Sequence, residues 1–408
     1  MKLRALAGAL VLAGVMTPAF ATNGYFSHGY GIKSKGMAGV GYALGQDALA
    51  AATNPANMVL VGSRWDVGLD YFRPQRESEI QGVGTFDGND TENFFIPEFG
   101  YNQMISNNMS LGVSVYGNGG MNTDYSKLNT VPLLPGPSPL GSGNAGVDLM
   151  QLFISPTLSM KLNENHAVGV SLKIAYQRFK AYGLQNVCAG LSSDPTNCSN
   201  KGYDDSWGYG IGLGWTGQLT PTFSVGVAYQ SRTWMQKFDK YKGLFAEQGD
   251  FDIPENYGIG FAWKATPQLT IAGDIQQINY GSIKSIANKG TAPGLLGDSN
   301  GRGFGWEDIT VYKLGVSYDV NKNLTLRAGY STTDEPYAGT ETFFNMLAPG
   351  VVTDHLTLGA TYRLANGGEL SFAYMHAFKN TVTGTGPSTG ISNRMYQDSF
   401  GVAYGMKF

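Results

Sequence analysis

The chain has 408 residues, of which only 14% are charged, and its formal net charge is −3. Soluble proteins carry about 25% charged residues, and the near-neutral balance gives no reason to expect a nucleic-acid partner. After the N-terminus no window holds about 20 consecutive apolar residues, which excludes helical membrane spans. With 57 Gly and 12% aromatic residues, the composition suits a transmembrane β-barrel, in which every second strand residue faces lipid.

Residues 1–21 have the three regions of a secretory signal peptide. These are a positive end at Lys2 and Arg4, an apolar run from Leu6 to Val15, and the cleavage site Ala19-Phe20-Ala21. The apolar run is too short to cross a bilayer as a helix. We therefore predict export, with a mature chain that starts at Thr22.

The segment 22–61 differs from the rest of the chain, because it is rich in Gly and Ala and has no sustained strand alternation. A short helical run is expected over 47–52, with Asp47 as its N-cap. Pro55 forces Asn54 out of helical geometry and ends that run. A segment of this kind at the start of a barrel fits inside the lumen, so we predict that 22–61 is an N-terminal hatch.

Residues 62–408 are predicted to be all-β, because apolar residues alternate with small or polar residues along many short runs. One such run contains Trp207, Tyr209, Ile211, Leu213 and Trp215, and the residues between them are Gly. In each run the apolar side can face lipid while the other side faces the barrel interior.

The connections between these runs alternate between tight turns and long polar loops. The turns are Ser106-Asn107-Asn108, Asn163-Glu164-Asn165, Thr220-Pro221, Thr266-Pro267, Asn321-Lys322-Asn323 and Asn366-Gly367-Gly368. The loops lie near 74–93, 119–146, 181–204, 235–250, 281–307, 335–350 and 379–395. Outer-membrane barrels have this asymmetry. Seven loops and six turns predict an antiparallel transmembrane β-barrel of 14 strands, with both termini in the periplasm.

The last run alternates up to a C-terminal aromatic residue, Phe408. Such an ending resembles the signal that the barrel assembly machinery recognises, although an ordinary final strand would look the same. Together with export, it predicts a monomeric, multi-pass protein of the bacterial outer membrane, surrounded by outer-membrane lipid.

The two cysteines, Cys188 and Cys198, lie in one polar loop. In an exported chain we predict that they form a disulfide, with free thiols as the alternative. The four histidines, His28, His166, His355 and His376, are scattered and lack metal-ligand spacing. We therefore expect no metal and no cofactor.

Several motifs follow one another in an order that resembles the FadL family of outer-membrane transporters. They include Gly36-Met37-Ala38-Gly39, Asn54-Pro55-Ala56, Asn118-Gly119-Gly120, Trp207-Gly208, Pro254-Glu255 and Tyr374-Met375-His376. Members carry long-chain fatty acids, and relatives carry aromatic hydrocarbons. The resemblance covers the mature chain. It implies a plugged barrel, an external low-affinity groove, a tighter lumenal site near the N-terminus, and lateral exit through a kink in the third strand.

The resemblance places that kink at Asn118-Gly119-Gly120. Gly inside a strand often marks a bulge or bend, and the alternative is a plain loop start. Asn54-Pro55-Ala56 is then expected to be a hatch element packed against the kinked strand, or else a simple helix stop.

An apolar ligand needs an apolar cavity with few polar groups. Tyr25 and Phe26 stand where the resemblance places the lumenal site, although packing of the plug would also use them. Leu133 and Leu134 belong to an unusually apolar external loop. We expect this loop to make the first contact with ligand.

A fatty-acid carboxylate would also need a buried cation. Among the inward-facing basic residues, Lys173 and Lys313 lie nearest the middle of their strands, and the alternative is that they pair with lumenal Asp66 or Asp70. The fatty-acid branch of the family has an arginine near its tight site where this chain has Gly183, which keeps hydrocarbons open as ligands.

We therefore predict facilitated diffusion of hydrophobic molecules, with long-chain fatty acids as the first expectation and aromatic or aliphatic hydrocarbons as the alternative. A general porin would have a charged lumen without a hatch. An outer-membrane lipase would need Ser, His and a polar orienting group on one face. Neither pattern is evident, so we expect a transporter and not an enzyme.

Overall fold

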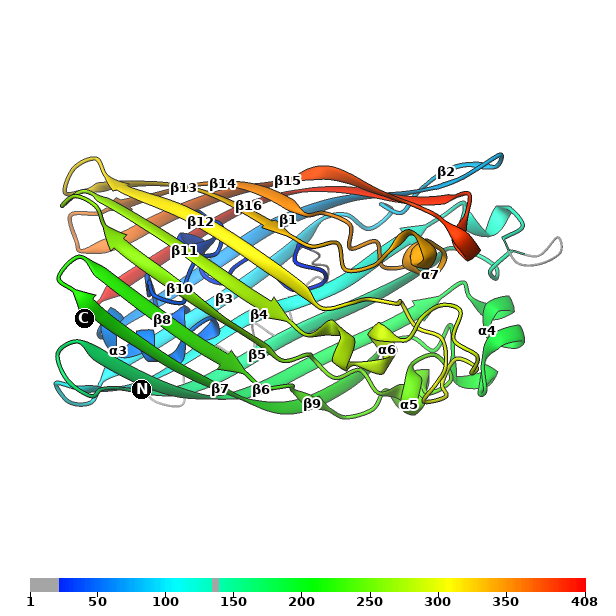
Figure 1. The fold of residues 1–408 in the computed structure, drawn as a ribbon, viewed down its shortest axis with the longest axis horizontal. Helices are drawn as coiled ribbons and strands as arrows, with labels where there is room; N and C mark the ends of the chain where they lie inside the picture. The colour runs from blue at the N-terminus through cyan, green and yellow to red at the C-terminus, as the bar shows by residue number, and fades with distance from the viewer. Residues whose placement is uncertain (1–21, 134–138) are drawn as a thin grey trace.

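The structure is a computed structural model that describes residues 22–133 and 139–408. The predicted signal peptide and Leu134 lie outside the described residues. Fourteen antiparallel strands close into a barrel, because the last strand pairs with the first from Arg64↔Lys407 to Ile80↔Ile391. Figure 1 shows this barrel from the side. The predicted fold class and strand number are confirmed.

The ring contains every long strand in chain order. Its members are β1 (Arg64–Ile80), β3 (Phe94–Met104), β4 (Met109–Tyr125), β5 (Ala145–Lys161), β6 (His166–Tyr182), β7 (Asp204–Thr220), β8 (Phe223–Gln230), β10 (Asn256–Lys264), β11 (Leu269–Ile278), β12 (Ile309–Asp319), β13 (Leu324–Thr333), β14 (Asp354–Arg363), β15 (Gly368–Thr383) and β16 (Ile391–Lys407). Two short strands lie beside the ring: β2 (Gly84–Asp87) pairs with β1, and β9 (Trp234–Met235) pairs with β7.

Short helical segments lie before the barrel and in its loops. Those before the barrel are α2 (Ile32–Lys35), the 3-10 turns η1 (Ala50–Ala52) and η2 (Pro55–Asn57), and α3 (Met58–Val61). Those in the loops are η3 (Leu128–Thr130), α4 (Gln185–Leu191), η4 (Pro195–Asn197), η5 (Asp239–Tyr241), α5 (Ala246–Gly249), η6 (Tyr280–Ser282), α6 (Lys284–Ala287), η7 (Gly339–Glu341), α7 (Thr342–Asn345) and η8 (Gly386–Ser388). Among the described residues, no helix is both long and apolar enough to cross a membrane.

The two ends of the barrel differ as the loop lengths predict. Tight turns gather at one end, and the long loops that carry α4 to α7 gather at the other (Figure 1). Three expected loops are shorter than predicted. In the segments near 119–146 and 379–395, β4 continues to Tyr125 and β15 continues to Thr383. The segment near 74–93 begins as the outer part of β1, which continues to Ile80. This part pairs with β16 through polar contacts such as the Arg394–Glu77 ion pair at 3.6 Å. Sequence reasoning missed it because it has no apolar face.

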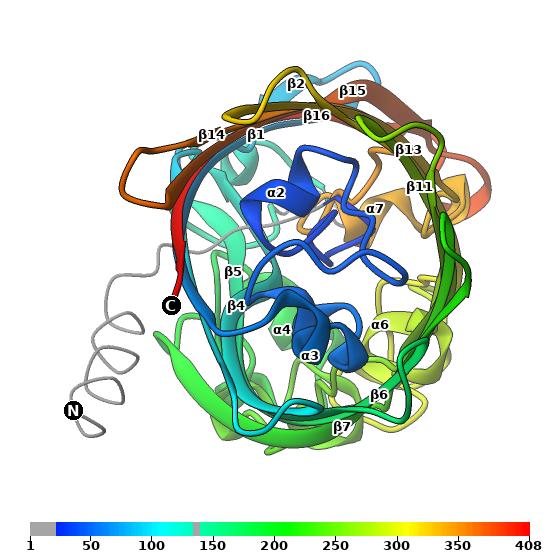
Figure 2. The ribbon, with the colours of Figure 1, turned by 90° about the vertical axis from the view of Figure 1, so that its left-hand side faces the viewer.

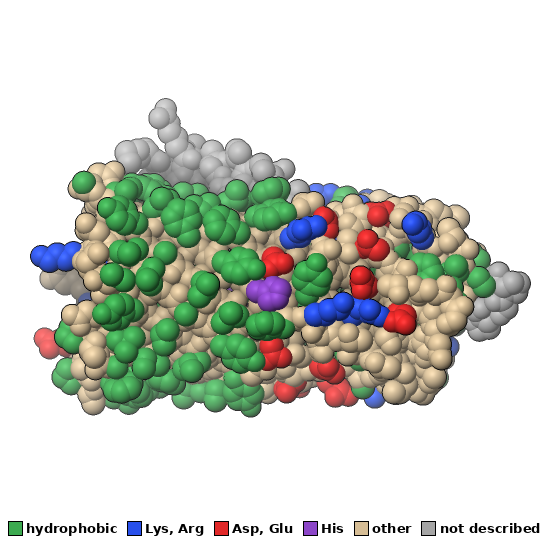
Figure 3. Space-filling view, turned by 90° about the horizontal axis from the view of Figure 1, so that it is seen from above, with side chains coloured by type: hydrophobic (Ala, Val, Ile, Leu, Met, Phe, Trp, Pro, Cys, Tyr) green, Lys and Arg blue, Asp and Glu red, His purple; other side chains and the backbone are tan. Residues whose placement is uncertain are grey.

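Hydrophobic side chains form a belt over the half of the barrel nearest the tight turns (Figure 3). Tyr209 and Ile211 of β7 are among the most exposed members, at 60% and 49%. Charged residues begin where the belt ends, and there Tyr374 donates a hydrogen bond to Asp398 at 2.6 Å. Tyrosines with an apolar ring and a bonded hydroxyl are typical of the membrane interface.

The segment 22–61 lies inside the ring, as the view into the barrel in Figure 2 shows. Glycines on the inner face of the wall make room for it. A Cβ atom at Gly214 would lie 1.9 Å from Asn54 Oδ1, and one at Gly226 would lie 1.9 Å from Tyr42 O. Gly214 of β7 and Gly226 of β8 therefore let the segment 22–61 lie directly against the strands. A Cβ at Gly208 or Gly210 of the same β7 run would instead meet residues 231–235.

Ion pairs hold the plug to the opposite side of the wall. Lys35 Nζ lies 2.5 Å from Asp70 Oδ2 of β1, and Lys33 pairs with Glu369 of β15. Glu369 Oε2 also lies 3.0 Å from Arg64 Nη2, which belongs to the wall itself. These side chains are largely buried, and buried charges are tolerated only when paired in this way.

Candidate ligand path

Asn54 attaches the hatch to the barrel wall. Its Oδ1 accepts a hydrogen bond from Ala56 N at 3.0 Å, which makes it the N-cap of η2. Its Nδ2 donates to Tyr42 O at 2.6 Å and to Thr216 Oγ1 at 3.0 Å. One side chain therefore joins three parts of the chain.

Asn54-Pro55-Ala56 packs against β5, β6 and β7. Ser159 Oγ of β5, for example, donates to Ala56 O at 2.9 Å. The expected packing of this motif against the kinked third strand, β4, is wrong. The preceding turn makes that contact instead, because Ser114 Oγ of β4 donates to Ala48 O at 2.7 Å.

The helical run expected over 47–52 is shorter in the structure. Only Ala50–Ala52 form a 3-10 turn, with Leu49 as the N-cap. Asp47 lies before it and accepts from Leu49 N at 3.0 Å. Contacts with β4 and β5 hold this short turn in place.

β4 is irregular at Asn118. The pairing of β4 with β5 shifts register between Gly117 and Gly119, so that Asn118 bulges out of the ladder. Its side chain donates to Gln151 Oε1 at 2.9 Å and accepts from the Tyr30 hydroxyl at 2.9 Å. The bulge is therefore fixed from both the wall and the hatch.

On its other side, β4 separates from β3. The ladder between them runs from Met104↔Ser110 to Phe99↔Val115 and ends there, although both strands continue. All residues of β4 from 116 to 123 are buried. At the outer end the wall resumes, where Asp124 N donates to Gly88 O at 3.0 Å. The stretch 116–123 thus lacks β3 as a pairing partner, and we call this interruption of the ladder the window.

The first residues of the described chain cover the inner side of this window. Gly120 N donates to Tyr25 O at 3.0 Å, and Ser27 N donates to Asn118 O at 2.9 Å. A Cβ at Gly119 would lie 1.9 Å from Tyr25 O. Glycine is required here because the two backbones touch.

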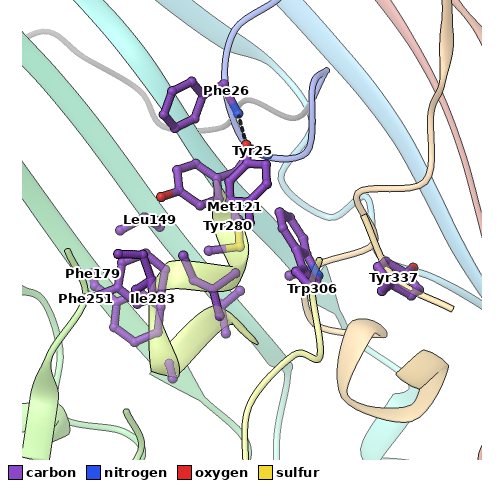
Figure 4. Packing of buried hydrophobic residues seen from close by; sticks show 14 of the residues in the cluster. Tyr25, Phe26, Met121, Leu149, Phe179, Phe251, Tyr280, Ile283, Trp306 and Tyr337 are labelled. Carbon is purple, nitrogen blue, oxygen red and sulfur yellow. Dashed lines mark hydrogen bonds between the residues drawn. The ribbon is translucent and has the colours of Figure 1, made fainter. Parts of the chain in front are cut away.

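Tyr280, in η6, holds this N-terminal segment in place. Its hydroxyl donates to Asn23 O at 2.6 Å and accepts from Tyr25 N at 3.1 Å and Phe26 N at 3.2 Å. Figure 4 shows Tyr280 among Tyr25, Phe26 and Trp306. Burial raises the pKa of Tyr280 well above its ordinary value, so its hydroxyl keeps the proton that it donates.

The two lysines proposed for a ligand carboxylate bind the hatch. Lys173 Nζ donates to Ala51 O at 2.9 Å and to the Tyr116 hydroxyl at 3.0 Å. Lys313 Nζ donates to His28 O at 3.1 Å. The alternative pairing with Asp66 or Asp70 is also not found, because those carboxylates bind Arg64 and Lys35.

A narrow apolar groove lies between the external loops. It holds about 660 Å³ of space outside protein atoms, part of it open to solvent. Its lining consists of Leu140, Val147, Phe179, Leu184, Val187, Leu244, Phe245, Ser285, Leu296, Arg302, Gly303, Phe304, Phe343, Phe344, Met346 and Leu347. Arg302 is the one charged residue of this lining, and its Nε is buried without a hydrogen-bond partner among the described residues.

Aromatic rings connect the groove with the N-terminal segment. The rings of Phe245 and Phe251 lie 4.7 Å apart, and those of Phe251 and Tyr25 lie 6.2 Å apart, between centroids. Tyr25 in turn contacts Trp306 at 6.0 Å. A contiguous cluster of buried aromatic rings therefore runs from the groove to the N-terminal segment.

A disulfide joins Cys188 and Cys198, with the sulfur atoms 2.06 Å apart. It closes the loop whose residues Leu184 and Val187 line the groove. Leu133 packs against the buried hydrophobic cluster that includes Leu184 and Val187. Within residues 22–133 and 139–408, no group of three or more His, Cys, Asp or Glu is placed to hold a metal ion.

Sequence reasoning missed Tyr280, Arg302 and Trp306, which lie at or near the polar segment 281–307. A signal was present, since Arg302-Gly303-Phe304-Gly305-Trp306 places two aromatic residues and a cation in a stretch otherwise rich in polar residues and Gly. Aromatic residues in an external loop have no membrane to face, so they indicate burial against another part of the protein.

A closed barrel with an apolar belt, a filled lumen and an apolar external groove defines an outer-membrane channel for hydrophobic molecules. Residues 13–407 match the family described as outer membrane protein transport protein (OMPP1/FadL/TodX), and the chain belongs to this family. It is therefore a transporter of hydrophobic compounds in the bacterial outer membrane and not an enzyme.

Known relatives are distant in sequence. The chain is 21% identical to the long-chain fatty acid transport protein of Escherichia coli O6:H1, over 92% of this chain and 90% of that protein. It is 23% identical to the 47 kDa outer membrane protein of Pasteurella multocida, over 83% of each. The Pseudomonas putida toluene transporter TodX has the same fold, with a TM-score of 0.73, 19% identity, and coverage of 93% of this chain and 99% of TodX.

Proposed function

We propose that this protein carries long-chain fatty acids across the outer membrane by facilitated diffusion. Arg302 is the observation that carries the proposal. An apolar groove with a single cation, whose Nε has no partner, suits a ligand with a long apolar tail and one negative charge. A hydrogen bond from a guanidinium to a carboxylate is among the stronger ones in proteins.

In the proposed route, the segment 22–61 acts as the hatch of a barrel formed by 62–408, after removal of residues 1–21. Ligand enters the groove near Leu133, moves along the aromatic residues to Tyr25 and Phe26, and leaves sideways through the window beside Asn118-Gly119-Gly120. The end of the β3–β4 ladder supports lateral exit, because the wall there lacks the hydrogen bonds that would have to break.

Aromatic or aliphatic hydrocarbons are the second candidate. Lys173 and Lys313 already donate to backbone carbonyls of the hatch, so neither is available to a ligand carboxylate in the lumen without loss of those bonds. The likeness to TodX, whose description names toluene, points the same way at the level of the fold. Arg302 supports fatty acids as the first candidate, because only an anionic ligand gains from it.

A binding comparison of purified Arg302→Gln and wild type tests the proposal. For oleate we expect an affinity loss of about tenfold, since a hydrogen bond to a charged group is worth about 1.5–3 kcal/mol. Toluene binding should not change. Arg73→Gln, which alters an exposed arginine paired with Glu92, is the matched control. Equal affinity of Arg302→Gln and wild type for oleate would favour hydrocarbons.

A further inference from the structure

Arg76 is a buried guanidinium that bridges the window in the wall. It extends from β1 and is only 1% exposed. Its Nη1 donates to Asn122 O at 2.5 Å and to Asn122 Oδ1 at 2.8 Å, both on β4. Nη2 donates to Thr91 O at 2.6 Å, and Nε donates to Asn89 Oδ1 at 3.2 Å.

All four of these acceptors are neutral oxygens, which is unusual for a buried cation. Burial of a charge is costly unless an opposite charge compensates it. The acids that face Arg76 at longer range are bound elsewhere: Glu92 pairs with Arg73 at 3.0 Å, and Asp87 accepts from Asn89 N at 2.9 Å. Among the described residues no carboxylate forms an ion pair with Arg76, so its charge is compensated only at longer range.

A small cavity adjoins the guanidinium. It has room for little more than a water-sized group and is lined by Arg76, Asn122 and apolar residues that include Met121, Trp306 and Met395. A carboxylate oxygen fits beside the guanidinium, and the carbons of an anionic amphiphile follow only if the neighbouring apolar side chains move aside.

This cavity continues the path that starts at the external groove. Phe304 and Leu347 line the groove, and Trp306 and Ala348 line the cavity beside Arg76, so the same two loops form both. Trp306 stands between them, held by a hydrogen bond from its Nε1 to Asn345 Oδ1 at 2.6 Å. A ligand that passes Trp306 arrives at Arg76 and β4.

We propose that Arg76 is a binding site for the carboxylate of the ligand at the lateral window, and that it determines specificity for anionic amphiphiles at the exit step. The inference rests on the proposed transport of fatty acids. A carboxylate that binds Arg76 competes with Asn122 O and Oδ1 for the same N–H groups. Binding therefore loosens the contact that ties β4 to β1 across the window.

Uptake into liposomes that contain the full-length protein tests this site. The two probes are oleate and methyl oleate, which differ only in charge. In Arg76→Gln we expect oleate uptake to fall about tenfold, as for loss of a charge-assisted hydrogen bond, while methyl oleate uptake stays at the wild-type rate. In Arg76→Lys, which keeps the charge but loses the planar fork, oleate uptake should recover in part. Lys264→Gln, at an exposed cation at the end of β10, is the control.

The outcomes separate this site from the transport proposal. An equal fall for both probes in Arg76→Gln, or an Arg76→Lys protein as slow as Arg76→Gln with oleate, would show that Arg76 only holds the wall together, and would overturn the inference. A wild-type protein that transports methyl oleate but not oleate would instead overturn fatty acids as the substrate.

Discussion

The two halves of the hatch are held by different kinds of contact. The second half, 47–61, is attached to β5, β6 and β7 by side chains such as Asn54, which fit between inward-facing glycines. The first half, 22–27, is held against β4 by backbone hydrogen bonds and by the Tyr280 hydroxyl. Both segments contact β4, but at different places: 22–27 bonds to Asn118 and Gly120, and 47–61 bonds to Ser114 through Ala48 O. Release of 22–27 therefore leaves the bond between Ser114 and Ala48 intact.

This difference suggests that 22–27 and 47–61 have separate roles in transport. A plug that left the lumen as a whole would open an aqueous pore and break many buried hydrogen bonds, each of which is costly to leave unmade. Release of 22–27 alone would uncover only the window beside Asn118. We propose that 47–61 stays fixed while 22–27 moves during the passage of hydrophobic molecules.

Displacement of the fixed half should have the largest effect. In Gly169→Leu, the new Cβ would lie 2.3 Å from Pro55 C, so Asn54-Pro55-Ala56 cannot keep its place against β6. We expect a steady ionic current through the variant in planar bilayers, where the wild type stays closed. Gly190→Leu is the control, because a Cβ at Gly190 has no neighbour within 4 Å. A closed Gly169→Leu channel would show that the motif does not position the plug.

A milder change should loosen the same half without expelling it. Asn54→Ala removes the N-cap of η2 and the donors to Tyr42 O and Thr216 Oγ1. We expect a loss of about 2 kcal/mol in local stability, measured as faster hydrogen exchange of the Ala56 and Asn57 amides. Exchange of the Gly120 amide should not change. Asn107→Ala, in an exposed turn, serves as control, and equal acceleration at Gly120 would contradict independent halves.

The smallest expected effect is the release of the first half. Tyr280→Phe keeps the ring but removes the hydroxyl that bonds Asn23 O, Tyr25 N and Phe26 N. Asn23 O and Phe26 N still bond each other at 3.2 Å. The test uses a thiol introduced by an added Ser27→Cys substitution. We expect a water-soluble maleimide to label it several-fold faster, because loss of one hydrogen bond of about 1 kcal/mol raises the population of the released segment by that factor. Tyr241→Phe, another buried loop tyrosine whose hydroxyl binds a backbone carbonyl, should label at the parent rate. Unchanged labelling in Tyr280→Phe would show that backbone pairing alone holds the segment.

The barrel itself could be predicted because its signals are local. Alternation of side chains follows from the two-residue period of a strand, and the difference between tight turns and long loops follows from the two sides of the membrane. Where the alternation was polar, as in the outer part of β1, the strand was taken for a loop. Side chains of this part still alternate between the two faces of the strand, but both faces are polar.

The ligand path was predicted less well, because its residues come together only in the folded barrel. The packing partner of Asn54 depends on which inward face carries the glycines that admit it. Lys173 and Lys313 face inward as their parity predicts, but their partners are hatch carbonyls distant in sequence. Arg302 and Tyr280 lie in a loop whose position no local pattern specifies.

The sequence by itself determined that residues 62–408 form a 14-stranded outer-membrane barrel and that 22–61 is unlike a strand. Periodicity and turn chemistry are properties of neighbouring residues, so they can be read along the chain. Only the tertiary structure decided which half of 22–61 is fixed and which half lies against the window. That depends on contacts between residues as far apart as Asn23 and Tyr280, which form only once the barrel has closed around the hatch.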